Sequence, residues 1–262
     1  MDTAVKELCA TGIPGSAVLT EGRRFLVKRA ENEEEINEAL RLRCRVFKEE
    51  QGRLADCSSL IDTDDFDSTS AHLLVIEKES CAVVGTYRLR SGDAASDGSG
   101  FYSEQEYRFF GLPAKRSGIL EIGRSCVASE YRNGSVVALL WAGLAEVCRR
   151  CKVEYMLGCA SLELKDFAVA RGVYRKLLEK KLVADFPRAV SRRGYHLTAG
   201  ETAVLDDAAF VRALPPLLKG YLRVGAKICG EPAFDRTFGS IDLPVWFDFV
   251  NLPEKYIRHF RV

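Results

Sequence analysis

A strand, a long helix and a second strand follow one another between residues 119 and 159, and this succession limits the fold more than any other stretch. Residues 119–127 are mostly apolar and predict a strand. In 134–151, apolar residues recur at the three- and four-residue spacing of one helix face. Residues 154–159 then predict another strand. We therefore expect an α/β fold in which helices flank a mixed sheet.

The flanking regions predict further helices and strands. Asn32 and Glu35 have the spacing of a capping box, in which side chains satisfy free N–H groups at a helix start. The helix that follows should end by residue 52. The other expected elements are strands at 25–29, 73–77 and 81–89, the last two forming an antiparallel hairpin, helices at 164–181 and 217–224, and short strands near 195–197, 237–241 and 245–250.

Length and composition indicate one folded protein with an ample core. The chain has 262 residues, of which 47% are hydrophobic. We predict an N-terminal segment (1–24), a core (25–186) and a C-terminal extension (187–262) that completes the sheet. The formal net charge of +1 provides no general attraction to nucleic acid, and no nucleic-acid motif is present.

The chain shows no sequence signal for export or for spanning a membrane. Its first residues lack the charged start and apolar run of a signal peptide. No stretch approaches the roughly 18 consecutive apolar residues of a spanning helix. We expect a cytoplasmic protein that is soluble, or at most lies on the inner face of the membrane.

Nine scattered cysteines indicate a reducing compartment rather than a disulfide scaffold. Cys148 and Cys151 have the spacing of a redox or zinc pair, but neither a second pair nor a suitably placed histidine completes a zinc site. A calcium loop starting at Asp62 also fails, because Asp67 stands where glycine is needed and Leu73 where glutamate is needed. We therefore expect no metal.

Four short charged patterns carry the functional signal. They are 43–47, 64–67, 85–88 and 121–124. Each places an ionisable side chain beside apolar residues of a predicted element or in the loop between elements. Isolated buried charges cost several kcal/mol, so we expect three arginines and three acids to converge on one site. For Arg43, the alternative that its stem reaches solvent is equally good on position alone.

The pattern 121–124 carries the most chemistry. Residues three apart in a regular strand face opposite sides, so Glu121 and Arg124 can serve one site only if the strand is bulged or splayed. Gly123 is where a bulge would be cheapest. A glutamate in such a cleft can accept a proton from an attacking amine. The alternative is an ordinary Glu121–Arg124 ion pair at a strand end.

Two other features are weaker taken alone. Residues 131–135 lead directly into a helix, and the free N–H groups of a helix start suit a phosphate. The acids at 62–67 suit the nearby arginines or a cationic substrate, and one or two of them are expected to be solvated.

Nearly the whole chain, about 25–260, resembles the acyl-ACP-dependent branch of the GNAT superfamily, the ornithine lipid synthases in particular. The matching stretches are RLRCRVFKEE (41–50), HLLV (72–75), VGTYRLR (84–90), GFYSEQEY (100–107), LEIGRSCV (120–127), YRN (131–133), LLW (139–141), GCAS (158–161) and LPPLLKGYLRVG (214–225). The resemblance implies a GNAT N-acyltransferase fold with a splayed central strand and a C-terminal extension. It also implies transfer of a 3-hydroxyacyl chain from acyl carrier protein to the α-amino group of ornithine, giving a lyso-lipid.

A more distant resemblance is to the acyl-homoserine-lactone synthases, whose charged cluster orders the acceptor site. The blocks shared with them fall on Arg43, Phe47, Asp64, Asp67, Arg88, Glu121 and Arg124. The lactone synthases carry a tryptophan soon after the first block, where this chain reads Gln51-Gly-Arg53. That departure and the long C-terminal match argue against a signal synthase.

The donor is inferred from a second departure. Acetyl-CoA-using relatives carry an Arg/Gln-x-x-Gly-x-Gly/Ala loop that holds a pyrophosphate, and Arg132-Asn-Gly-Ser-Val-Val does not complete it. Such a loop fits the single phosphate of acyl-phosphopantetheine on a carrier protein. We expect that arm as co-substrate, no bound cofactor, and a phosphate near Arg132, Asn133, Gly134 and Ser135.

The expected reaction is direct aminolysis of a thioester. Glu121 takes a proton from the acceptor, Arg88 or Arg124 holds its carboxylate, and Asp64 or Asp67 holds its side-chain ammonium. The resemblance also places Arg43, Phe47 and His72 at the substrate. A nucleophilic cysteine, Cys126 or Cys159, is the rival mechanism, and neither has an obvious base beside it.

Several partners and functions stay open. A basic face for the acidic carrier protein is expected among Arg149, Arg150, Lys152, Arg175, Lys180, Lys181, Arg192 and Arg193. The segment 214–224 with Trp246, Phe247 and Phe249 either lines an acyl tunnel, touches lipid or packs in the core. Alternative functions are transfer to glycine or another amino acid, a signal synthase, and an acyl-group sensor without turnover.

Overall fold

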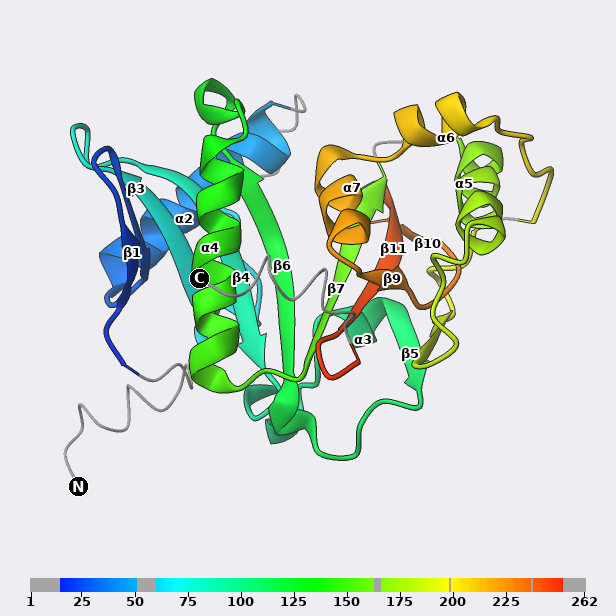
Figure 1. The fold of residues 1–262 in the computed structure, drawn as a ribbon, viewed down its shortest axis with the longest axis horizontal. Helices are drawn as coiled ribbons and strands as arrows, with labels where there is room; N and C mark the ends of the chain where they lie inside the picture. The colour runs from blue at the N-terminus through cyan, green and yellow to red at the C-terminus, as the bar shows by residue number, and fades with distance from the viewer. Residues whose placement is uncertain (1–14, 51–59, 163–165, 198, 237, 252–262) are drawn as a thin grey trace. The chain divides into compact units, whose positions relative to one another are not determined.

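The computed structural model describes residues 15–50, 60–162, 166–197, 199–236 and 238–251 (Figure 1). The chain divides into two compact units. The first unit takes the chain up to Asp97 together with Leu120–Val153, and the second takes Gly98–Ile119 and the chain from Glu154 onward. Each unit is described by itself.

The sheet of the first unit consists of antiparallel strands in the order β1-β2-β3-β4-β6. Their bounds are Val18–Glu21 (β1), Phe25–Arg29 (β2), Ala71–Glu77 (β3), Val83–Ser91 (β4) and Ile119–Val127 (β6). The predicted strands 25–29 and 119–127 are confirmed, as is the hairpin, now β3–β4. The edge strand β1 was not predicted, because four partly exposed residues carry little periodic signal.

Two helices pack on this sheet, α2 (Glu33–Cys44) and α4 (Ser135–Cys151) (Figure 1). The predicted cap of α2 is confirmed, because the Asn32 side chain accepts a hydrogen bond from the Glu35 N–H at 2.9 Å. The Glu35 carboxylate accepts the N–H of Glu31 at 2.8 Å, one residue before the usual capping-box partner. The chain continues from α2 into a π-helical turn, η1 (Arg45–Glu49).

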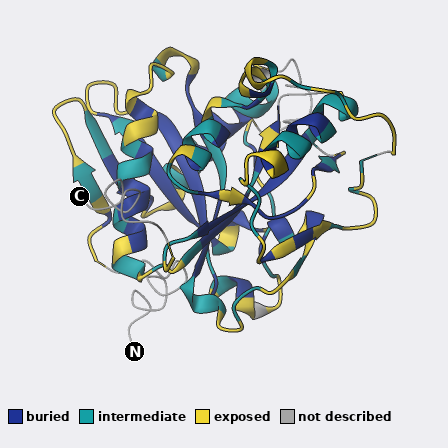
Figure 2. Cartoon of the chain, turned by 45° about the vertical axis from the view of Figure 1, so that its right-hand side comes forward, coloured by how far each residue is buried: buried dark blue, intermediate teal, exposed yellow. Residues whose placement is uncertain are grey.

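The two helices cover opposite faces of the sheet. On one face, α4 lies so close that a Cβ atom on Gly143 would be 2.7 Å from Val27. On the other face, Leu42 of α2 packs with Leu74 and Cys126 of the strands. Buried residues accordingly concentrate in the strands, and exposed residues lie on loops and outer helix faces (Figure 2). The expectation of an α/β fold with helices on a sheet is confirmed.

The second unit has its own strands and helices. The strand β11 pairs antiparallel with β7 along its length and also with β9 and β10, and a separate two-stranded sheet joins β5 and β8. The strands are β5 (Tyr107–Phe110), β7 (Tyr155–Leu162), β8 (Arg188–Ser191), β9 (Lys227–Ile228), β10 (Ala233–Asp235) and β11 (Ser240–Asp248). The helices are α3 (Ser103–Glu106), α5 (Phe167–Glu179), α6 (Asp207–Ala213) and α7 (Pro216–Arg223).

Sequence reasoning described this unit less well. The strand predicted at 154–159 and the helices predicted at 164–181 and 217–224 are present as β7, α5 and α7. The two strands expected near 237–241 and 245–250 form one strand, β11. The strand expected near 195–197 is an isolated bridge from His196 to Ala233. The elements β5, β8 and α6 were not predicted.

The aromatic residues of β11 settle one open alternative. Trp246 and Phe247 are buried, and the Trp246 ring stacks on Tyr155 with 5.0 Å between centroids. On α7, Leu218 and Tyr221 are buried as well. The interpretation as core packing is therefore confirmed for these four residues. None of the helices in the described ranges combines the length and apolarity needed to cross a bilayer.

Candidate active site

The site begins with a buried arginine at the end of α2. Arg43 is 0% exposed, which settles its predicted orientation toward the core over the alternative of reaching solvent. Its Nε atom donates to Asp62 at 3.0 Å, and its Nη1 atom donates to Asp67 at 2.6 Å. Both carboxylates come from the segment that precedes β3. Arg43 thus fixes that segment to α2 through two charge-assisted bonds.

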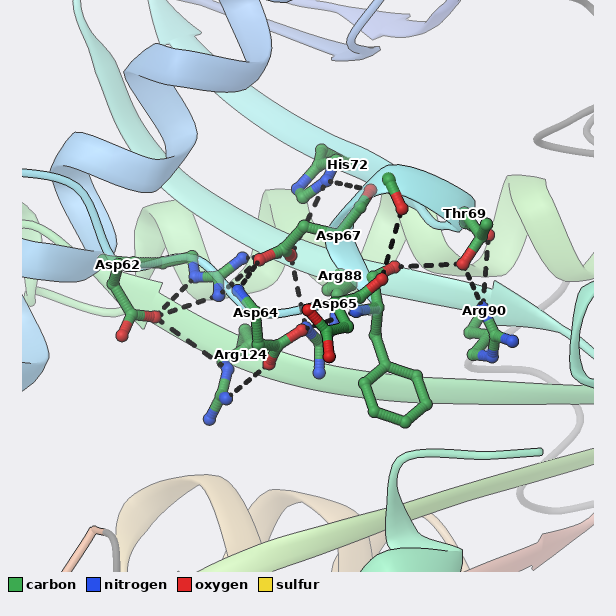
Figure 3. Close-up of polar contacts among 12 residues, drawn as sticks. Asp62, Asp64, Asp65, Asp67, Thr69, His72, Arg88, Arg90 and Arg124 are labelled. Atoms are coloured by element: carbon green, nitrogen blue, oxygen red, sulfur yellow. Dashed lines mark hydrogen bonds and ion pairs between the residues drawn. The ribbon is translucent and has the colours of Figure 1, made fainter. Parts of the chain in front are cut away.

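A second arginine extends the cluster from the sheet. Arg88 of β4 forms an ion pair with Asp64, and its Nη1 atom also lies 3.2 Å from Oδ1 of Asp67. The acids order their own loop as well, because Asp67 accepts the N–H of Asp64 at 2.8 Å and Asp64 accepts the N–H of Phe66 at 2.9 Å. Figure 3 shows these carboxylates gathered against the arginine side chains.

The third arginine reaches the cluster because β6 is bulged. Opposite β4, Arg88 pairs with Gly123 and Thr86 pairs with Cys126, so β6 carries one extra residue between these pairs. The predicted bulge is confirmed, but the left-handed residue is Arg124 (φ +50°) rather than Gly123. A non-glycine residue there costs about 1–3 kcal/mol. In return, Arg124 Nη2 lies 2.7 Å from Oδ2 of Asp64 (Figure 3).

The cluster is buried at one end and accessible at the other. At the buried end, Asp62 and Asp67 are 3% and 6% exposed around Arg43. At the other end, the side chains of Asp64 and Arg124 are 23% and 11% exposed. The accessible pair offers one anionic and one cationic group side by side.

The arginines keep the acids ionised. Burial opposes ionisation of Asp64, but hydrogen bonds and charges from Arg88 and Arg124 outweigh it and hold the pKa of Asp64 well below its usual range. The pKa of Asp67 is lowered in the same way, against burial, chiefly by Arg43. Three arginines therefore meet acids that are negative at neutral pH, as the sequence predicted. Asp62, one of the acids expected to pair with the nearby arginines, pairs with Arg43 at 2.9 Å.

His72 lies directly behind the cluster on β3. It is 1% exposed, and its Nε2 atom lies 3.4 Å from the carbonyl oxygen of Asp67 and 3.9 Å from Oδ1 of the same residue. Burial lowers the pKa of His72 to about 4, and the charges of Arg43 and Arg88 act in the same direction against Asp67. The imidazole is therefore neutral at neutral pH. Its predicted contact with substrate stays a prediction.

Glu121 shares a sheet face with the cluster. In the β4–β6 register it stands opposite Arg90, and Gly123 stands opposite Arg88. Directly opposed residues of antiparallel strands project to the same side, so Glu121 belongs to the face that carries Arg88. Its side chain is buried, at 5% exposure. Its role as the proton acceptor stays a prediction.

Phe47 takes a different position. It lies in the π-helical turn after α2 and packs against the apolar cluster formed by Leu42, Leu74 and Cys126. These contacts support the end of α2, and the predicted contact of Phe47 with substrate stays a prediction.

Arg90 was not singled out from the sequence. It is 1% exposed and donates to the Thr69 hydroxyl at 2.6 Å and to the Ala94 carbonyl at 2.9 Å. Its guanidinium lies 5.2 Å from the ring centroid of Phe66, which also faces Arg88 at 5.7 Å. Its position two residues after Arg88 in a strand was the signal for a shared face.

The predicted phosphopantetheine loop stands at the start of α4, and all four of its residues are exposed. The Asn133 side chain accepts the N–H of Ser135 at 3.0 Å, and Gly134 takes a left-handed conformation (φ +94°) with open space beside it. Arg132 donates to the Val127 carbonyl at 2.9 Å and pairs with Glu50 at 2.8 Å. The loop is thus ordered by its own contacts, and phosphate binding there stays a prediction.

A neighbouring contact holds this loop to the sheet. The Tyr131 hydroxyl donates to Glu77 at 2.7 Å, and Arg24 donates to the same carboxylate at 2.6 Å. Hydrogen bonds from Ser80, Tyr131 and Arg24 lower the pKa of Glu77 to about 2.

The cysteines give little support to the rival mechanism. Burial raises the pKa of Cys126 to about 12, so its thiol is protonated at neutral pH. Cys148 and Cys151 are free thiols. Cys44, next to Arg43, is disulfide-bonded. The expectation of a reducing compartment did not predict that disulfide.

One group of acids has a geometry that could hold a cation. Ligand atoms of Glu106, Asp235 and Asp242, all buried in the second unit, lie within 4.8 Å of one another. Each has contacts within the protein. The expectation that the protein needs no metal stays a prediction.

A family of known proteins matches the part of the chain that carries the cluster. The family described as Acetyltransferase (GNAT) domain matches residues 42–142, a span that includes every arginine and acid of the cluster. Among solved structures, the acyl-homoserine lactone synthase BjaI superposes with a TM-score of 0.52 at 16% identity, over 87% of this chain and 81% of that chain. The AHL synthase LasI gives 0.52 at 14% identity, over 92% and 96%. At these identities the likeness shows the fold alone.

Two relatives are similar over most of the sequence. An L-ornithine N(alpha)-acyltransferase from Brucella abortus is 34% identical over 89% of this chain and 88% of its own. A protein of the same name from Rhodobacter capsulatus is 33% identical over 88% of this chain and 93% of its own.

The fold and the matched domain define an acyltransferase of the GNAT class, which confirms the predicted fold class. Within that class, the chain belongs to the family of the L-ornithine N(alpha)-acyltransferases.

Proposed function

We propose that this protein transfers a 3-hydroxyacyl chain from acyl carrier protein to the α-amino group of ornithine, giving a lyso-lipid. The observation that carries the proposal is the accessible Asp64–Arg124 pair at the edge of a buried charged cluster. Ornithine carries a carboxylate and a side-chain ammonium, and this pair offers a complementary charge to each. The names of the relatives support the same acceptor.

The acceptor binds by exchanging partners with this pair. Its carboxylate takes the place of Asp64 on Arg124, with Arg88 close by, and its δ-ammonium binds the carboxylate of Asp64. Arg43, Asp62 and Asp67 hold the Asp64 loop in position from the buried side. Because these buried ion pairs stay in place, only the Asp64–Arg124 pair has to separate when the acceptor binds.

Glu121 serves as the proton acceptor. It removes a proton from the α-ammonium, directly or through water, and the neutral amine attacks the thioester carbonyl. A new C–N bond forms, the C–S bond breaks, and the thiolate of phosphopantetheine leaves with a proton. Backbone N–H groups beside the bulge of β6 polarise the carbonyl. No covalent enzyme intermediate is needed, which agrees with the protonated thiol of Cys126.

The donor arm approaches the start of α4. Its single phosphate meets the free N–H groups of the first turn and Arg132, which is 44% exposed at its side chain. We infer that the acidic carrier protein docks on a basic face, for which the last turn of α4 supplies Arg149 and Arg150. Arg149 and Arg150 both pair with Glu146, so the positive charge they offer is partly neutralised.

The test is free-thiol release from 3-hydroxyacyl carrier protein and from 3-hydroxyacyl-CoA, with mass spectrometry of the products. Ornithine-dependent release from the carrier protein with an acyl-ornithine product is expected. Release with glycine or another amino acid instead would reject ornithine as acceptor, and an acyl-homoserine lactone product would make the protein a signal synthase. A folded protein that releases no thiol with any acceptor would be an acyl-group sensor.

A further inference from the structure

The two-stranded sheet β5–β8 has one side whose side chains are exposed. In its register, Arg108 stands opposite Val190 and Phe110 stands opposite Arg188. All four side chains project to one side and are exposed, whereas Ala189, on the other side, is buried. On the outward face, each arginine therefore stands opposite an apolar side chain.

The apolar side chains of this face and of the turn beside it are exposed to water. Phe110 is 44% exposed and Val190 is 38% exposed. Phe186, in the turn before β8, is 75% exposed, and its ring lies beside Gly111, where a Cβ atom would come within 3.0 Å of it. Phe186 thus extends the apolar surface past the end of β5. Two phenylalanines and a valine on one small sheet indicate a surface that is covered in use.

The charged part of the face is positive. Arg108 lies over the ring of Phe110 at 4.9 Å from its centroid. Among the described residues, neither Arg108 nor Arg188 forms an ion pair, in contrast to the Arg149–Glu146 and Lys180–Asp207 pairs elsewhere. Asp185, beside Phe186 in the chain, is the exposed acid closest in sequence to the face. The positive charge of the two arginines is therefore available to an anionic partner.

We propose that this face, defined by Arg108, Phe110, Phe186, Arg188 and Val190, docks on an anionic phospholipid bilayer. Aromatic side chains prefer the headgroup level of a bilayer, and arginines between them bind lipid phosphates. Apolar side chains inserted among the headgroups lose their exposed surface, and the arginines are attracted by the negative surface potential. The alternation of the two kinds of side chain on one side of a two-stranded ribbon lets both act at once.

A bilayer fits this face better than an acidic protein does. The apolar side chains outnumber the arginines, and the most exposed one, Phe186, belongs to a turn beside the strands rather than to a groove. The inference goes beyond the proposed reaction, because it concerns a surface of the second unit and holds for any acceptor or donor.

The test is co-sedimentation of the full-length protein with vesicles of phosphatidylcholine alone and of equal parts phosphatidylcholine and phosphatidylglycerol. Binding to the anionic vesicles is expected, with weakening in high salt. Arg108→Gln with Arg188→Gln should weaken binding by roughly 30-fold, about fivefold per arginine. Phe110→Ser with Phe186→Ser should weaken it by at least about tenfold.

Matched controls come from exposed residues of the same unit. Arg212→Gln with Lys227→Gln, and Val204→Ser with Val211→Ser, remove equal charge and comparable apolar surface elsewhere and should leave binding unchanged. All changes lie on the surface, so circular dichroism should show each variant folded. Phe110→Trp provides a direct readout, because its fluorescence should shift to shorter wavelength on anionic vesicles whereas that of Val204→Trp should not.

Three results would overturn the proposal. The first is a folded wild-type protein that does not bind anionic vesicles. The second is equal binding by the face variants and the controls. The third is a Phe110→Trp variant whose fluorescence wavelength does not change when it binds anionic vesicles. If Arg108→Gln with Arg188→Gln loses binding to purified acyl carrier protein while no variant binds vesicles, the face belongs to a protein partner instead.

Discussion

Nη1 of Arg43 lies 2.6 Å from Oδ1 of Asp67, and this bond joins the last turn of α2 to the loop that presents Asp64. Both side chains are almost fully buried, at 1% and 5% exposure. The relationship separates the residues that hold the site in place from those that substrate can reach. Substitutions of the buried residues are therefore expected to change the free energy of unfolding, and substitutions of the accessible residues are expected to change the kinetics.

Arg43→Met should destabilise the protein strongly. Removal of the guanidinium leaves Asp62 and Asp67 as buried charges with one partner fewer, which costs about 3–5 kcal/mol in the free energy of unfolding. Urea unfolding measures the loss. Arg41→Met, two residues earlier and more than half exposed at its side chain, should change stability by less than about 1 kcal/mol. Equal losses in the two variants would refute the structural role of Arg43.

His72 should make stability fall as pH drops from about 6.5 to about 4. Burial lowers its pKa to about 4 in the folded protein, whereas the unfolded chain takes up the proton near 6.5. The unfolded state therefore binds more protons in this window, and stability declines by up to about 1.4 kcal/mol per pH unit. The stability that Asp64 and Asp67 contribute through their lowered pKa values is lost only below about pH 4.

Urea unfolding at several pH values checks this prediction. His72→Gln should flatten the curve between about pH 6.5 and 4. If His72→Gln keeps the wild-type slope, another group is responsible.

Glu121→Gln should lower kcat by about 100- to 10,000-fold, because it removes the proton acceptor. Rates with the carrier-protein donor and ornithine measure the effect. Raising the pH deprotonates more of the free acceptor amine and should therefore recover part of the lost rate. A variant with full activity would exclude Glu121 as the base.

Substitution of Gly85 in β4 and of Gly123 in β6 should separate an effect on packing from an effect on the reaction. A Cβ atom on Gly85 would lie 2.6 Å from Val136, so Gly85→Ala should lower stability by about 1–3 kcal/mol. Gly123 has no atom within 4 Å of such a Cβ, so Gly123→Ala should fold normally. Because the thioester approaches the bulge there, Gly123→Ala should still lower kcat/KM by about tenfold or more. Unchanged kinetics would place the thioester elsewhere.

The long periodic elements could be predicted from the sequence, and the short ones could not. The spacing of Val136, Leu140 and Leu144 gives α4 a clear helical face, and β6 is a nine-residue strand. In contrast, β5 and β8 have four residues each and form a sheet only through pairing across 78 positions, from Phe110 to Arg188. Local propensity contains no information on such a partner.

The site shows the same division. Arg43, Arg88 and Arg124 were predicted to meet acids, because charges beside apolar residues need partners. Which of the acids at 62–67 meets which arginine depends on the path of the loop before β3, and there Asp62 and Asp67 both pair with Arg43. The left-handed Arg124 could not be predicted either, because its strain is offset by contacts formed only in the folded chain, among them the ion pairs with Asp64 and Asp62.

The central claim is that the Asp64–Arg124 pair recognises the two charged groups of ornithine. The most direct measurement is kcat/KM for ornithine and for norvaline, which lacks the δ-ammonium, in the wild type, Asp64→Asn and Asp65→Asn. Asp65 is an exposed neighbour in the same loop and serves as the matched charge control. We predict that the wild type and Asp65→Asn prefer ornithine by about 10- to 100-fold and that Asp64→Asn loses this preference. An Asp64→Asn variant that keeps the full preference would contradict the account.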